Sequence, residues 1–296
     1  MKIVSTSGRD DLATVYVGEI DGRRVEFVES VEPPFARDEK WVVIVSSLYG
    51  CPVECEMCDA GGSYKGRPSA DDILAQIDHV VRLRYPSGVI PSKKLKIHFA
   101  RVGDPSLNPA VLDVLERLPL AYDAPGLFPS VSTVAPKGTD AFFDRLIDIR
   151  DAFYHGKFQL QFSIHSTDEG VRDRIIPVPK WSLEEISDYG GRFFREGERK
   201  ITLNFILAAG YAIDPKRLRS IFSPEMFFVK LTPLNPTSKG ANRGLVCAAG
   251  NDCLQNKAEP EIAGRLRAEG FDVLWSVGDL GENLIGSNCG QYLGKS

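Results

Sequence analysis

The sequence lacks the short motifs that mark several common enzyme classes. None of the patterns HExxH, GxSxG and GxxxxGK[ST] occurs in its 296 residues, and only four histidines are present. Those patterns are typical of zinc proteases, serine hydrolases and P-loop nucleotide-triphosphatases. Their absence removes the commonest forms of these three activities.

Long apolar runs and a surplus of positive charge are also absent. Apolar runs such as 41–45 are far shorter than the ~20 residues of a membrane-spanning helix, and the N-terminus has no apolar stretch of signal-peptide length. Lys and Arg total 36 against 40 Asp and Glu, a net charge of −4. Proteins whose main task is to bind nucleic-acid phosphates usually carry a basic face. We expect a cytoplasmic protein that does not contact a membrane.

Segments typical of β-strands alternate with helical patterns along most of the chain. A β-hairpin is predicted around Asp21-Gly22, a strong turn signal. Six strands are predicted at 41–47, 94–100, 128–134, 158–165, 200–208 and 226–232, and six helices at 70–85, 108–118, 139–150, 182–196, 215–221 and 257–269. Such alternation predicts a parallel sheet. We therefore expect an α/β fold, a partial (β/α)6 barrel over 41–296 with an N-terminal β-hairpin extension over 1–40.

Three of the six cysteines lie close together at the start of the predicted barrel. Cys51, Cys55 and Cys58 read CPVECEMC, a C-x3-C-x2-C pattern in the loop after the first barrel strand. Soft thiolates select iron–sulfur clusters, and three of them leave one iron of a [4Fe–4S] cluster open to a small chelating ligand. A closed zinc site, with a fourth thiolate from one of the later cysteines, is the alternative.

Polar residues and glycines gather where the predicted strands end. The carboxyl ends of parallel barrel strands meet at one rim, where the chemistry of such folds is located. The residues at this rim are Gly103 and Asp104 after the second strand, Ser132 at the third, Ser163 and His165 at the fourth, and Asn235 after the sixth. Each residue type alone is more often structural, and only their shared position makes them candidates.

The cysteine spacing resembles the radical S-adenosylmethionine superfamily, with Met57 where an aromatic residue is usual. Six blocks in the same order further resemble the RlmN/Cfr-type methyltransferases, which methylate an adenine carbon of RNA. The blocks are VSSLYGCPVECEMC (45–58), ARVGDPSLNP (100–109), SVSTVAP (130–136), FSIHSTDEGVRDRIIPV (162–178), KLTPLNP (230–236) and SNCGQYLG (287–294). The resemblance implies a [4Fe–4S] cluster and S-adenosyl-L-methionine as cofactors. It also implies an electron donor such as flavodoxin or ferredoxin.

The resemblance also implies roles for the candidate residues. The cluster is expected on the three clustered cysteines, and S-adenosylmethionine against the rim residues. Gly103 lets the backbone approach the cofactor, and Asp104, which stands where the family usually has Glu, can pair with its amino group. Ser132, Ser163 and His165 offer hydroxyl and imidazole partners, and Asn235 can bond the ribose.

Cys289, in the last block, matches the family cysteine that carries a methyl group. The resemblance implies that Cys289 takes a methyl group from one S-adenosylmethionine and then loses a hydrogen atom to a 5′-deoxyadenosyl radical. The resulting carbon radical adds to an sp2 carbon of the acceptor. We expect Cys289 to lie on a flexible arm that enters the barrel mouth. Glu26, in VEFV, aligns with a glutamate that the family uses as a proton acceptor.

Two departures from the family pattern affect the expected substrate. Ile44 occupies the position of the cysteine that resolves the covalent adduct, and the family's N-terminal RNA-binding domain is missing. We therefore expect a small-molecule or nucleoside-like acceptor rather than a large RNA. Four roles are open for Cys247 and Cys253: they replace the missing thiol, form a redox pair, bind metal, or have no role. The alternatives are an RNA adenine methyltransferase, a non-methylating radical enzyme (rearrangement, cleavage or sulfur transfer) and a zinc-bound RNA- or protein-binding module.

Overall fold

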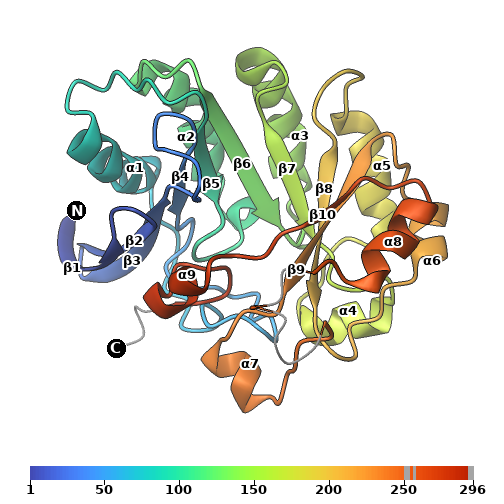
Figure 1. Cartoon of the computed structure of the whole chain (residues 1–296). Coiled ribbons are helices and arrows are strands. Elements are labelled where there is room, and N and C mark those ends of the chain that lie inside the picture. The colour runs from blue at the N-terminus through green and yellow to red at the C-terminus, as the bar shows by residue number, and fades with distance from the viewer. Residues whose placement is uncertain (250–253, 256–257, 293–296) are drawn as a thin grey trace.

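The computed structural model describes residues 1–249, 254–255 and 258–292, and within them the strands form one ten-stranded sheet (Figure 1). The strands lie side by side in chain order. They are β1 (Lys2–Arg9), β2 (Ala13–Ile20), β3 (Arg23–Ser30), β4 (Trp41–Val45), β5 (Leu95–Phe99), β6 (Leu127–Thr133), β7 (Gln159–Ser163), β8 (Ile201–Leu207), β9 (Phe227–Pro233) and β10 (Val273–Trp275). Pairing is antiparallel from β1 to β4 and parallel from β4 to β10.

The N-terminal strands extend the parallel sheet on one side. The predicted hairpin is confirmed: β2 and β3 pair across a turn in which Asp21 and Gly22 have φ of 48° and 74°, as a type I′ turn requires. Strand β1 was missed because its residues are almost all exposed and show no apolar alternation. Since β3 pairs with β4, the hairpin and the barrel share one sheet. The division of the chain at residue 40 stays a prediction.

The parallel part of the sheet matches the predicted barrel strands. Each of the six predicted strands is present within two residues at either end. A seventh parallel strand, β10, pairs with β9 and was missed because it is only three residues long. Sequential parallel strands with helical crossovers form the predicted partial barrel.

The helices that connect the parallel strands pack mainly on the outer face of the sheet (Figure 1). They are α1 (Ala70–Arg84), α2 (Ala110–Ala121), α3 (Asp140–Ile149), α4 (Glu169–Ile175), α5 (Leu183–Phe193), α6 (Pro215–Ile221) and α8 (Glu261–Ala268), with short turns η1 (Pro105–Leu107) and η2 (Arg150–Tyr154). Helix α1 begins as predicted, since the Ser69 hydroxyl and Asp72 carboxylate form a reciprocal capping box. The predicted helix 257–269 begins at Glu261 in the structure, and residue 257 lies outside the described residues.

Three short helices, α4, α7 (Ser238–Asn242) and α9 (Leu280–Ile285), were not predicted. Each has at most seven residues, too few for a clear helical period. Helix α9 lies beside the N-terminal strands (Figure 1), where Ile285 packs with Leu12, Val28 and Ile44. The C-terminal part of the chain thus returns to the start of the barrel. Among the described helices, none is both long and apolar enough to cross a membrane.

The two faces of the parallel sheet differ in polarity. Residues such as Val43, Ile97 and Phe99 face the outer helices and are fully buried. The alternate positions point inward and include lysine, histidine, serine, glutamine and asparagine (Lys96, His98, Ser132, Gln161, Asn204 and Lys230). Because side chains alternate along a strand, one sheet builds both the apolar core and a polar barrel interior.

Candidate active site

The three clustered cysteines lie on a loop that follows β4 and ends before α1. Backbone hydrogen bonds between Cys51 and Gly62, with N···O distances of 3.3 and 2.8 Å, close this loop. Gly50 has φ of 75°, and a Cβ there would lie 2.4 Å from the Ser63 carbonyl oxygen, so the close approach of the two loop strands requires glycine. Cys51, Cys55 and Cys58 are free thiols in the structure.

The protein environment of these thiols suits a soft metal ligand set. Burial raises the pKa of Cys58 to about 12, with a smaller contribution from Cys289. Burial also raises the pKa of Cys55 well above its usual range. For Cys51, backbone hydrogen bonds from Val53 and Glu54 partly oppose the rise in pKa that burial causes. A bound metal deprotonates such thiols, and three thiolates match the preference of iron–sulfur clusters.

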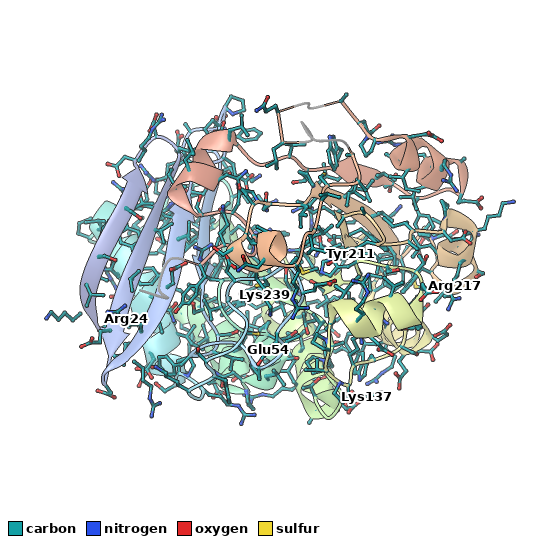
Figure 2. All side chains as sticks on the ribbon, turned by 90° about the horizontal axis from the view of Figure 1, so that it is seen from below. Arg24, Glu54, Lys137, Tyr211, Arg217 and Lys239 are labelled. Carbon is teal, nitrogen blue, oxygen red and sulfur yellow. The ribbon has the colours of Figure 1, made fainter. Side chains whose placement is uncertain are left out.

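Charged side chains hydrogen-bond the cysteine loop to the rest of the barrel. The Glu56 carboxylate accepts two hydrogen bonds from Arg174, at 2.9 and 2.7 Å, and a third from the Tyr211 hydroxyl at 3.1 Å. Both Arg174 hydrogen bonds come from one terminal nitrogen, and such charge-assisted hydrogen bonds are stronger than neutral ones. Lys239 of α7 donates to the Glu54 carbonyl oxygen at 2.9 Å, and these two residues lie together in Figure 2. The loop is therefore held from both α4 and α7.

Gly103 and Asp104 support the cysteine loop from the neighbouring strand. Gly103 has φ of 94°, and a Cβ there would lie 2.4 Å from the Leu48 Cβ. The buried Asp104 carboxylate accepts hydrogen bonds from Ser106, Thr133 and the Val134 amide, at 2.7 to 3.0 Å. Burial raises the pKa of Asp104, and these hydrogen bonds oppose that rise. Asp104 thus joins η1 to the end of β6, whereas its predicted contact with a cofactor amino group stays a prediction.

The predicted serine and histidine residues lie on neighbouring strand ends. The Ser132 hydroxyl is 2.8 Å from Nε2 of His98, a residue that the sequence analysis did not single out. Ser163 pairs in register with Asn204. His165 accepts a hydrogen bond at Nδ1 from the Ile206 amide at 3.3 Å, and burial lowers the pKa of His165 to about 3. His165 is therefore a neutral acceptor at physiological pH.

The C-terminal segment that carries Cys289 lies against the cysteine loop. The Gly290 carbonyl oxygen accepts from the Asp59 amide at 2.7 Å, and Asn235 donates to the Cys289 carbonyl oxygen at 3.1 Å. A negative charge on Cys289 would raise the pKa of Cys58, which agrees with the hydrogen bond between the residues that follow the two cysteines. The structure therefore brings Cys289 to the cluster loop although 230 residues separate it from Cys58. These contacts hold the segment against the cysteine loop in the structure, and the flexibility expected of this arm stays a prediction.

Glu26 and Arg101 form a buried ion pair beneath this segment. Arg101 Nε donates to the Glu26 carboxylate at 2.7 Å, and its terminal nitrogens donate to the carbonyl oxygens of Gly286 and Ser287 at 2.6 and 3.1 Å. Glu26 is completely buried, and the Arg101 side chain is 3% exposed. This geometry gives Glu26 an anchoring role, and its predicted role as a proton acceptor stays a prediction.

The remaining candidate residues add no thiol to the site. Ile44 lies on β4, in register with Val28 and His98, and its side chain packs among aliphatic residues. Cys247 is disulfide-bonded, and Cys253 lies outside the described residues. In this structure the thiols of Cys51, Cys55 and Cys58 are not drawn together as the ligands of one metal ion, and no other three His, Cys, Asp or Glu side chains among the described residues are either.

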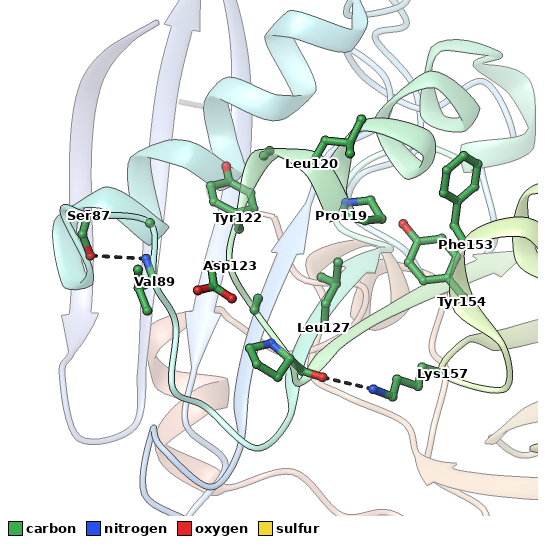
Figure 3. Close-up of a pocket in the computed structure, with 14 residues that line it drawn as sticks. Ser87, Val89, Pro119, Leu120, Tyr122, Asp123, Leu127, Phe153, Tyr154 and Lys157 are labelled. Atoms are coloured by element: carbon green, nitrogen blue, oxygen red, sulfur yellow. Dashed lines mark hydrogen bonds between the residues drawn. The ribbon is translucent and has the colours of Figure 1, made fainter.

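A cavity of about 640 Å³ lies at the opposite end of the sheet, near the amino ends of β6 and β7 (Figure 3). Its wall includes Leu120, Tyr122, Phe153 and Tyr154. None of the predicted site residues lines it. The candidate site is therefore defined by the convergence of the cysteine loop, strand ends and C-terminal segment rather than by this cavity.

Comparison with known proteins relates the chain to one group. No protein-family model matches it. It is 27% identical over 282 residues to a protein from Thermotoga sp. (strain RQ2) named a probable dual-specificity RNA methyltransferase RlmN, covering 92% of this chain and 76% of that protein. A protein of the same name from Parafrankia sp. (strain EAN1pec) is 27% identical over 288 residues, covering 92% and 69%. A solved radical SAM methyltransferase from Sphaerobacter thermophilus matches the fold with a TM-score of 0.72 and 23% identity, covering 98% and 80%.

These similarities confirm the resemblance and the fold class predicted from the sequence. They give no support to the expectation that RNA suits this chain less well than a small molecule, since the similar proteins are named RNA methyltransferases. The motif blocks made the relationship visible. Arg101, His98 and Lys230 were missed as site residues, although their alternation with apolar neighbours on or beside strands was a readable signal.

Proposed function

We propose, on the premise that this chain is a relative of the RlmN radical S-adenosylmethionine methyltransferases, that it transfers a methyl group from Cys289 to an sp2 carbon of a nucleoside-containing acceptor. The observation that carries the proposal is the 2.7 Å hydrogen bond from the Asp59 amide to the Gly290 carbonyl oxygen, which joins the residue after Cys58 to the residue after Cys289. A cysteine near the chain end has no structural need to reach the cysteine loop. Asn235, Asp59 and Arg101 all contact its segment.

The donor chemistry of the residues fits the cofactors that the relationship implies, although the three loop thiols are not drawn together as a metal-ion site in this structure. Cys51, Cys55 and Cys58 would hold a [4Fe–4S] cluster, and the strand-end groups around Ser132 and Ser163 would face S-adenosylmethionine. When bound, the cluster supplies one electron, received from a donor such as flavodoxin or ferredoxin, for radical formation from S-adenosylmethionine. The chain's own residues bury the three thiols, hold the loop against α4 and α7, and fix the Cys289 segment.

Arg101 and Lys230 favour the thiolate form of Cys289. Cys289 is exposed as a residue, but desolvation of its thiol raises its pKa overall, and the positive charges of Lys230 and Arg101 reduce that rise. A thiolate is the nucleophile in alkylation of a cysteine. The two cations therefore support a role for Cys289 as an acceptor of a methyl group.

Peptide mass spectrometry tests the proposal. The protein is reconstituted without oxygen with iron and sulfide, then incubated with methyl-labelled S-adenosylmethionine. We expect a methyl group on Cys289, and 5′-deoxyadenosine on addition of a reductant. An unmodified Cys289 peptide in iron-loaded protein would contradict the methyl-carrier role and favour a non-methylating radical enzyme.

Two variants separate the roles of the cysteines. Cys51→Ala should lose bound iron and 5′-deoxyadenosine formation together. Cys289→Ala should keep both and lose the methylated peptide. Zinc instead of iron in the anoxically purified protein would favour the binding-module alternative. Acceptor assays should include adenosine and an RNA oligonucleotide, because the similar proteins are named RNA methyltransferases.

A further inference from the structure

The carboxylate that follows the third loop cysteine binds the start of α7. Asp59, the residue after Cys58, accepts hydrogen bonds from the backbone amides of Ser238 and Lys239 at 3.0 and 2.8 Å, and its side chain is buried. Hydrogen bonds to an ionised acceptor are stronger than neutral ones. Asp59 therefore fixes α7 against the cysteine loop, although 179 residues of sequence separate it from Ser238.

A second contact with α7 lies on the other side of Cys58. The buried Thr237, which is the N-cap of α7, donates from its hydroxyl to the Met57 carbonyl oxygen at 2.9 Å. The same hydroxyl accepts a hydrogen bond from the Gly240 amide at 3.1 Å. The residues before and after Cys58 are thus both hydrogen-bonded to the first turn of one short helix.

The chain just before α7 holds the segment that carries Cys289. Asn235 donates to the Cys289 carbonyl oxygen, and the Gln291 side chain donates to the Pro236 carbonyl oxygen, both at 3.1 Å. The start of α7 therefore contacts the cysteine loop and the Cys289 segment at once. These contacts form a junction of three segments, 57–59, 235–239 and 289–291.

Asp59 joins all three segments of this junction. Its carboxylate holds the start of α7, and its backbone amide donates to the carbonyl oxygen of Gly290, the residue after Cys289, at 2.7 Å. Loss of the carboxylate would release α7 from the cysteine loop. Because Asn235 and Pro236 immediately precede α7, that release would also move the contacts that hold Cys289.

We propose that Asp59 is a positioning residue whose carboxylate, acting through α7, sets where Cys289 lies relative to Cys58. This inference rests on the proposed function and deepens it, since it names what holds the methyl carrier in place. A misplacement of about 1 Å can slow a reaction by about a hundredfold. Asp59 therefore affects the rate of methyl transfer to Cys289 through the backbone groups that it binds.

Hydrogen–deuterium exchange tests the position of the segment independently of activity. In iron-loaded protein without S-adenosylmethionine, Asp59→Ala should speed exchange of the amides at 287–291 about tenfold, the effect of losing hydrogen bonds to a charged group. Asp214→Ala is the matched control, because Asp214 also accepts two amide hydrogen bonds at the start of a short helix, from Lys216 and Arg217 at 2.9 and 3.2 Å. It should leave exchange at 287–291 unchanged.

The rate of Cys289 methylation gives the second measurement. At parental iron content, Asp59→Ala should methylate Cys289 about tenfold more slowly than the parent protein, and Asp59→Asn, which keeps one acceptor oxygen, should lie between the two. Thr237→Val should also slow methylation, whereas Thr237→Ser, which keeps the hydroxyl, should restore it. Asp214→Ala should keep the parental rate, so a general loss of stability does not account for the difference.

Three results would overturn the inference. The first is equal exchange at 287–291 in Asp59→Ala and Asp214→Ala, and the second is an equal rate of methylation in these two variants. The third is loss of iron from Asp59→Ala, which would assign Asp59 to cluster binding. Absence of methylation in the parent protein would instead contradict the proposed function, and the exchange comparison would then decide whether Asp59 positions the segment.

Discussion

Arg101 joins Glu26 of the N-terminal hairpin to the C-terminal segment. Its Nε donates to the Glu26 carboxylate at 2.7 Å, and the same guanidinium donates to the Ser287 carbonyl oxygen at 3.1 Å, two residues before Cys289. The contacts bring together residues near positions 26, 101 and 288. The position of the proposed methyl carrier therefore depends on an ion pair that contains neither a cofactor ligand nor a cysteine.

Removal of this guanidinium should weaken both the fold and the modification of Cys289. Arg101→Ala removes the Arg101 hydrogen bonds from the fully buried Glu26 carboxylate, which should lower the free energy of unfolding by about 3–5 kcal/mol. Urea unfolding measures that loss. Arg145→Ala, which breaks exposed ion pairs of α3 with α2, is the control and should cost at most about 1 kcal/mol.

A double variant separates stability from positioning. Glu26→Leu combined with Arg101→Met removes both charges, and an apolar pair of similar size should restore most of the lost stability. It cannot restore the hydrogen bonds to Gly286 and Ser287. We therefore expect the methylated fraction of Cys289 to stay low in the double variant. Parental methylation in that stable variant would show that Arg101 does not position Cys289.

We expect position 103 to require glycine mainly because a larger side chain would overlap Leu48, and less because of its backbone φ. Gly103→Ala and Gly138→Ala introduce the same methyl group at φ of 94° and 83°, but only the first meets Leu48, since nothing lies within 4 Å at Gly138. The left-handed conformation should lower the free energy of unfolding of both variants by about 1–2 kcal/mol. Overpacking against Leu48 should lower that of Gly103→Ala by about 1–3 kcal/mol more. Urea unfolding and iron content per chain measure the difference. Equal losses of stability and iron in the two variants would contradict the proposed contact.

Acid should destabilise the protein partly through His165. The pKa of His165 is about 3 in the folded protein, below the ~6.5 of an unfolded imidazole. Between these values the unfolded chain binds more protons, so stability is complete above pH 6.5 and falls as the pH falls. The loss from pH 6.5 to pH 4.5 should be roughly 2–3 kcal/mol.

Paired unfolding curves at pH 7.5 and pH 4.5 test this dependence. His165→Asn, which tolerates the φ of 63° at this position, should show a smaller loss on acidification than the parent protein. His155→Asn, at an exposed position after η2, is the control and should show the parental loss. An unchanged pH dependence in His165→Asn would contradict the assignment of a buried neutral imidazole.

Replacement of Asp104 should cost stability even when no cofactor is present. Asp104→Asn converts one acceptor oxygen into a donor that faces the Thr133 hydroxyl or the Val134 amide. The free energy of unfolding should fall by about 1–3 kcal/mol. Asp113→Asn, on the exposed face of α2, should cause a much smaller change. Parental stability of Asp104→Asn without cofactor would assign Asp104 to cofactor binding alone.

Regular periodicity predicted the parallel part of the fold well. Strands such as β5 and β7 carry apolar residues at alternate positions, and α1 carries its capping box in Ser69 and Asp72. These signals are local, so a single sequence contains them. The exposed strand β1 and the six-residue helix α9 carry no such period, because the positions of both depend on contacts with β2.

The candidate site was predicted as a set of residue types rather than as an arrangement. The motif blocks identified Cys51, Cys55, Cys58 and Cys289 without any coordinates. They did not show that Asp104 is already bonded to Thr133 and Val134. That assignment needs the pairing of β5 with β6, which places the end of one strand against the end of the next.

The sequence by itself determined the cysteine spacing, the alternation of strands and helices, and the order of the motif blocks, because covalent order and local side-chain periodicity carry them. Only the tertiary structure decided that Arg101 pairs with Glu26 and that the segment carrying Cys289 lies against the cysteine loop. Each of these contacts depends on curvature and pairing of the sheet over more than seventy residues of chain. The energy of such contacts comes from burial of charge and hydrogen bonding between distant segments, which no local pattern encodes.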